Sequence, residues 1–78
     1  VQASVYPNPF RDIVTIDGKE IRHIMLFNLQ GQKILERKLD HNVSSKPNLN
    51  LGSLQSGYYI IKIIDKSGSI YTGSLVKE

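Results

Sequence analysis

The sequence predicts an all-β fold, an antiparallel β-sandwich of about seven strands in a single domain. Three observations predict it. Turn-forming residues recur about every eight to twelve positions, a spacing typical of small sandwiches. Many of the intervening segments alternate in steps of two, as strands do. Near the C-terminal end, a leucine, a glycine and a tyrosine match the spacing of a tyrosine corner, which is found in Greek-key sandwiches.

The corner motif reads Leu-x-x-Gly-x-Tyr and ends at Tyr59. Gly57 can supply a backbone conformation that other residues disfavour. We therefore expect the Tyr59 hydroxyl to bond to upstream backbone, and the residues up to 65 to form a long central strand. Its core-facing side is predicted to carry Tyr59, Ile61 and Ile63.

The N-terminal half is predicted to begin with an edge strand over residues 1–6. Pro7 and Pro9 end it, because proline fixes φ and lacks an amide proton. A second strand covers residues 12–17, with Val14 and Ile16 on one face, and Asp17-Gly18 marks a turn. Tyr6 and Phe10 are expected to cover one end of a sheet.

The next two predicted strands form a hairpin. Residues 21–29 carry apolar side chains on both faces, which indicates a central strand covered on each side and a core position for Phe27. Residues 28–31 form the loop, where Gly31 is expected to need a positive φ. Residues 32–39 return at the edge of the sheet, with one mostly polar face.

The remaining elements alternate short strands with turns. Residues 40–47 are polar and predict a loop, residues 48–51 a short strand, and residues 66–68 a tight turn into a last strand over residues 69–77. We expect Lys77 and Glu78 to be a fraying terminus whose removal costs little stability.

Composition excludes several classes of protein. The 78 residues include no cysteine, so disulfides and thiolate metal sites are excluded. The net charge of +3 is spread along the chain rather than clustered, which argues against a nucleic-acid partner. No apolar run approaches the roughly 20 residues that span a bilayer, so we expect no membrane insertion by the domain itself.

No group of residues predicts catalysis or a cofactor. His23 and His41 are the only histidines, whereas a metal site generally needs three or four convergent ligands. The serines lie in turns without a neighbouring base. Four aspartates fall at predicted strand ends, where they favour turns: Asp12, Asp17, Asp40 and Asp65. We expect no enzyme activity, no metal and no cofactor.

Four features together closely resemble one family. They are Tyr-Pro-Asn-Pro-Phe at residues 6–10, Asn-Leu-Gln-Gly-Gln at residues 28–32, the extended corner motif at residues 51–59, and the terminal Lys77. In this combination and order they resemble the C-terminal sorting domain of the type IX secretion system, the Por secretion system of Bacteroidetes-type bacteria. The likeness covers residues 5–78.

The resemblance implies an immunoglobulin-like sandwich that acts as an address label on a larger cargo. Residues 5–78 would be the sorting domain and residues 1–4 the end of an upstream linker. The implied partners are the outer-membrane translocon and a sortase-like peptidase that cleaves upstream of the Tyr-Pro-Asn-Pro motif. The implied location is the periplasm in transit, then the cell surface or the extracellular space.

The family's motif positions fall on a small set of residues in this chain. The expected recognition residues are Pro7, Asn8, Pro9, Gly57, Tyr59, Lys77 and Glu78. The same prolines, glycine and tyrosine would also serve the turns of any small sandwich, so a structural role stays open.

Two other functions remain open at this point. One is an accessory adhesion or carbohydrate-binding module, which would show an exposed aromatic strip and affinity for glycans. The other is a small nucleic-acid-binding barrel, which would bind DNA or RNA in a salt-sensitive manner.

Overall fold

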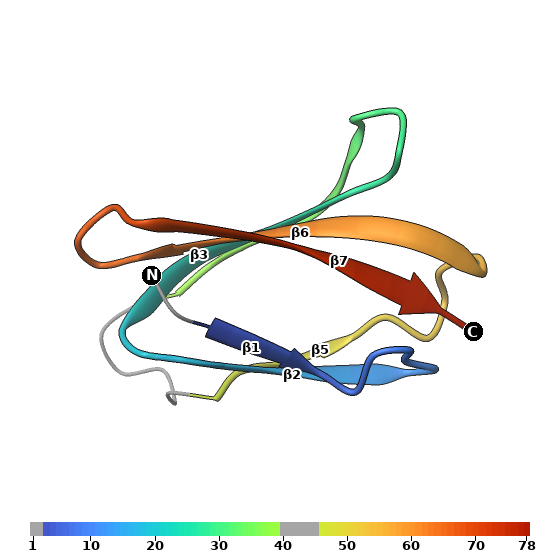
Figure 1. The fold of residues 1–78 in the computed structure, drawn as a ribbon, viewed down its shortest axis with the longest axis horizontal. Coiled ribbons are helices and arrows are strands. Elements are labelled where there is room, and N and C mark those ends of the chain that lie inside the picture. Colours follow the sequence, from blue (N-terminus) through green and yellow to red (C-terminus); the bar gives the residue numbers. More distant parts are fainter. Residues whose placement is uncertain (1–2, 40–45) are drawn as a thin grey trace.

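A computed structural model describes residues 3–39 and 46–78 of the chain. Its strands pack as two antiparallel sheets, one above the other (Figure 1). The described residues contain no helix, and their seven strands are β1 (Ala3–Tyr6), β2 (Ile13–Gly18), β3 (Ile21–Phe27), β4 (Lys33–Lys38), β5 (Asn48–Asn50), β6 (Gly57–Asp65) and β7 (Ile70–Lys77). The predicted all-β sandwich is confirmed.

The sheets have the orders β1-β2-β5 and β4-β3-β6-β7. This is an immunoglobulin-like arrangement in which β4 stays beside β3, whereas constant-type domains place the fourth strand in the other sheet. The tight β3–β4 loop explains the difference. Asn28 N donates to Gln32 O at 3.0 Å, and Gly31 has a φ of 86°, as the sequence predicts.

The core lies between the two sheets and is formed by alternate residues of the strands. Tyr59, Ile61 and Ile63 are buried on the inner face of β6, which confirms the predicted alternation. They share the core with Phe10, Val14, Ile16, Ile21, Ile24, Leu26, Leu49, Leu51 and Leu75.

The two aromatic residues near the N-terminus have different environments. Phe10 is fully buried, but Tyr6 is 43% exposed, so the expectation that both cover a sheet end is wrong for Tyr6. The alternation of β1 explains this, because Ala3 and Val5 face inward and Ser4 and Tyr6 face outward.

β3 is a central strand between β4 and β6, as predicted. Only its inner face is fully covered. Ile24 and Leu26 are completely buried, whereas Met25 and Phe27 are half-buried on the outer face. The predicted core position of Phe27 is therefore wrong. Its ring instead lies 5.9 Å from the Lys62 ammonium, a distance that permits a cation–π contact.

The turn after β2 lies two residues later than the sequence suggests. Gly18 is still part of β2, where it pairs with Ala3, and the bend falls at Lys19 and Glu20. A Cβ at position 18 would come within 2.9 Å of Ile21 Cδ1. A larger residue there would require the Ile21 side chain to shift, so Gly18 serves close packing rather than a turn. Of the predicted loop at 40–47, residues 40–45 lie outside the described part of the chain.

Candidate functional site

The residues that the resemblance marks gather at one end of the sandwich. Gly57 pairs with Lys77 across β6 and β7, and Tyr59 pairs with Leu75 two positions further on. The segment after β1 comes back to the same place, and Figure 1 draws it beside the C-terminus. Three parts of the motif that are far apart in sequence therefore meet.

Asn8 connects its segment to β7 through its side-chain amide. Its Oδ1 accepts a hydrogen bond from Val76 N at 2.9 Å, and its Nδ2 donates to Ser74 O at 3.1 Å. The prolines on either side have no amide proton to offer to a strand. The Asn8 amide thus occupies the place of a peptide group at the edge of β7.

Phe10 continues the pairing with its own backbone. Its N–H donates to Val76 O at 2.8 Å, and its carbonyl accepts from Glu78 N at 2.9 Å, which makes a parallel bridge opposite Lys77. Its fully buried ring fixes the segment to the core. We call Asn8 and Phe10, together with the residues that they bond (Ser74 and Val76 of β7, and Glu78 just after it), the clasp.

The clasp corrects one expectation about the terminus. Lys77 and Glu78 do not fray, because the end of β7 is paired with β6 on one side and with Phe10 on the other. Arg11 Nε also lies 3.1 Å from Glu78 Oε1, but both side chains are largely exposed, so this ion pair contributes little. Removing the last two residues will cost more stability than the sequence suggests.

The tyrosine corner lies next to the clasp and confirms the sequence prediction. The Tyr59 hydroxyl donates to Gln55 O at 2.7 Å, and the ring is buried. Gly57 begins β6 with a φ of 146°, in the region that favours glycine. Leu54 N donates to Leu51 O at 3.1 Å, which closes the turn that leads into the corner.

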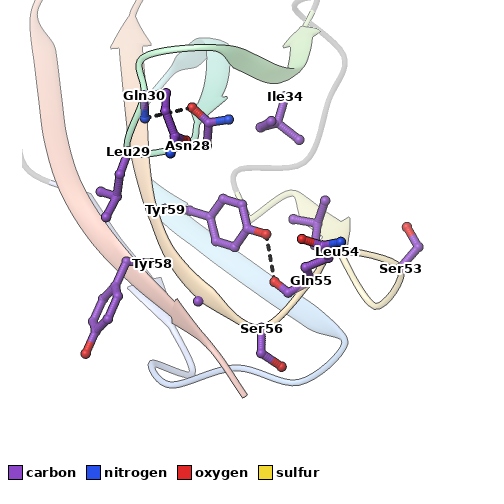
Figure 2. A pocket seen from close by; sticks show the side chains of 11 residues that line it. Asn28, Leu29, Gln30, Ile34, Ser53, Leu54, Gln55, Ser56, Tyr58 and Tyr59 are labelled. Atoms are coloured by element: carbon purple, nitrogen blue, oxygen red, sulfur yellow. Dashed lines mark hydrogen bonds between the residues drawn. The ribbon is translucent and has the colours of Figure 1, made fainter.

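A groove of about 450 Å³ opens beside the corner. Figure 2 shows the loop between β3 and β4 on one wall and the corner on the other, with Tyr59 between them. Its lining residues are Asn28, Leu29, Gln30, Ile34, Ser53, Leu54, Gln55, Ser56, Gly57, Tyr58 and Tyr59, none of which is charged.

Two acidic groups have perturbed pKa values, and both lie outside the clasp. Hydrogen bonds from Lys33 and His23 lower the pKa of Glu36. Asp65 has its pKa lowered by the Ser67 hydroxyl and by the backbone N–H groups of Ser69 and Ser67. These interactions belong to the β3–β4 pair and to the β6–β7 turn.

The described ranges contain no group of three or more histidine, aspartate or glutamate residues that could hold a metal ion. His41, the second histidine, lies outside them. Nor does the part of the chain seen here include a helix long and apolar enough to cross a bilayer.

The sequence indicated Asn8, Lys77 and, through the motif at residues 28–32, part of the groove lining, but not the β7 groups to which Asn8 bonds. Ser74 and Val76 take part through backbone atoms, so their side chains carried no signal. The one available signal was an asparagine between two prolines, which predicts a turn and gives no indication of a strand some 66 residues away.

Comparison with known families agrees with this arrangement. A model described as the secretion system C-terminal sorting domain matches residues 4–78. Comparisons with curated proteins and with solved structures gave no match. The family match covers nearly the whole sequence and includes the clasp, the corner and the groove. The chain therefore belongs to the family of C-terminal sorting domains of the type IX secretion system.

Proposed function

We propose that this domain directs a larger cargo across the outer membrane through the type IX translocon, which reads the clasp end of the sandwich. The main support is that Asn8 and Phe10 are hydrogen-bonded to the end of β7. The chain also matches the sorting-domain family over residues 4–78. A folded label must be recognised by its surface, and this end gathers the family's motif positions.

The exposed residues at this end are the candidates for contact with the translocon. The Pro7-Asn8-Pro9 turn is exposed and Lys77 is half-buried, whereas Gly57 pairs with Lys77 across the sheet and Tyr59 is buried. Asn8 and β7 are separated by 66 to 68 positions in the sequence, so this surface forms only when the chain is complete and folded. Such a signal would prevent export of truncated or unfolded chains.

Removal of the domain is the second part of the proposal. A sortase-like peptidase at the cell surface cleaves upstream of Tyr6, where residues 1–4 end the linker. Ala3 and Ser4 of β1 pair with Gly18 and Asp17 of β2. Cleavage close to Ala3 and Ser4 therefore requires the edge strand β1 to separate from β2. The cargo then stays at the surface or in the medium, after its passage through the periplasm.

The test is a fusion of residues 1–78 to the C-terminus of a periplasm-targeted reporter, in a host with a type IX system. The intact domain should bring the reporter to the surface, and a domain lacking Lys77 and Glu78 should leave it in the periplasm. Thermal melts of both purified domains show whether the truncated one is folded at the assay temperature. An intact, folded domain that never leaves the periplasm would refute the proposal.

A further inference from the structure

The groove beside the tyrosine corner has an unusual surface for this chain. Three of the six large hydrophobic side chains exposed in residues 3–39 and 46–78 line it, with exposures of 64% for Leu29, 40% for Ile34 and 63% for Tyr58. Exposed apolar side chains that gather at one place indicate a site of interaction.

The chemistry of the lining restricts the partner. Charged residues make up 22% of the sequence, yet none of the groove's lining residues is charged. Burying a charge against such a surface without a counter-charge is costly. The groove therefore favours a segment that is itself uncharged and largely apolar.

The polar groups of the groove are suited to a peptide backbone. Gln30 and Gln55 each present a side-chain amide with a donor and an acceptor, and no bond from either amide to the described residues occupies them. In Figure 2, Leu29 and Tyr58 lie on one side of the start of β6, and Ile34 and Leu54 lie on the other. Apolar side chains on both sides of the start of β6, together with two unbonded side-chain amides in the same lining, match an extended peptide better than a sugar, which would need a broader aromatic platform.

We propose that this groove binds an uncharged, extended apolar segment of the export machinery. The inference rests on the proposed function and adds a second contact to it. The groove adjoins the clasp, because Tyr58 pairs with Val76, whose N–H and carbonyl bond Asn8 and Phe10. A partner that covers this end of the sandwich can reach both.

The test compares variants in the same reporter fusion. Leu29→Ser combined with Tyr58→Ser removes the two most exposed apolar side chains of the groove without touching a buried one. Ile70→Ser is the matched control, because Ile70 is 56% exposed on β7 and lies outside the groove. Removing two central contacts should reduce surface reporter by about tenfold or more. The control should export like the wild-type domain.

A conservative pair keeps the test independent of folding. Leu29→Met with Tyr58→Phe retains an apolar surface and should restore export, and melts should give all the variants similar midpoints. Wild-type export together with full export of the serine double variant would overturn the groove proposal and leave the proposed function intact. Failure of the wild-type fusion would instead remove the proposed function itself.

A separate crosslinking experiment identifies what binds in the groove. Replacing Tyr58 with a photo-crosslinking phenylalanine analogue should join the domain to a protein of the translocon, and Leu29→Asp should abolish that product. If the domain instead binds the host's surface polysaccharide, loses that binding on Tyr58→Ser and still exports, the groove is a carbohydrate site and the proposal is wrong.

Discussion

The two ends of the β6–β7 hairpin are held in different ways. At the closed end, Asp65 accepts bonds from Ser67 and Ser69, only two to four residues away. At the open end, Asn8 and Phe10 bond to residues of β7 that are 66 to 68 positions away. The first end is a local turn, whereas the second exists only after the whole sandwich has formed. Hydrogen bonds between near neighbours in sequence close the hairpin at Asp65. The clasp surface, which we propose the translocon recognises, forms only in the complete fold.

The largest expected loss of unfolding free energy is for a substitution at Phe10, at the open end, whose ring is fully buried. Phe10→Ala should destabilise the domain by about 3–5 kcal/mol, through lost burial and the cavity left behind. Ile70→Ala, at the closed end, should change stability by no more than about 0.5 kcal/mol. Denaturant unfolding of both variants measures this, and similar midpoints would show that Phe10 is no anchor.

The second-largest change in unfolding free energy is expected at Asn8. Asn8→Ala removes two hydrogen bonds and should cost about 1–2 kcal/mol in unfolding free energy. Asn8→Asp should not restore it, because a carboxylate cannot donate to Ser74 O. Hydrogen exchange gives a direct readout, since the Val76 amide should lose protection in Asn8→Ala and keep it in Asn8→Asp, whose carboxylate can still accept its bond. Unchanged protection of that amide in Asn8→Ala would mean that the side chain does not pair with the strand.

A smaller effect is expected at the tyrosine corner. Tyr59→Phe removes the hydroxyl that bonds Gln55 O and should cost about 1 kcal/mol. Tyr58→Phe is the matched control, because the neighbouring ring is largely exposed and its hydroxyl makes no bond to the described residues. Chemical unfolding should separate the two variants. Equal stability would refute the structural role of the corner bond.

The smallest effect is at the closed end and depends on pH. The pKa of Asp65 is lowered by its bonds from Ser67 and Ser69. A depressed pKa means that the ionised group stabilises the fold above its unfolded value near 3.8, and that this contribution disappears as the pH falls through the folded value. Asp65→Asn should therefore be slightly less stable than wild type at pH 7, with the gap closing below pH 3.8. A gap that does not change with pH would contradict this.

Prediction from sequence succeeded where structure depends on neighbours in the chain. The turn glycines, Gly31 and Gly68, and the alternation along β6 were all readable, because each follows from local geometry. The Tyr59 bond was also foreseen, since it spans only four residues. Phe27 was misplaced because alternation alone does not tell which face of a central strand is covered.

The candidate site was less predictable than the fold. Its residues were named through family motifs, but their contacts depend on two segments that meet only in the folded sandwich. The fraying expected for Glu78 was wrong because nothing near it in sequence indicates that Phe10 will bond its amide. Partners that act through their backbones leave no trace in side-chain patterns.

The most direct test of the account compares one substitution at each end of the same hairpin. Reporter fusions carrying Asn8→Ala or Asp65→Asn are assayed at a temperature at which both purified domains are fully folded. The Asp65→Asn fusion should reach the surface like the wild type, whereas the Asn8→Ala fusion should stay in the periplasm. Equal export of the two would contradict the claim that the export machinery reads the clasp.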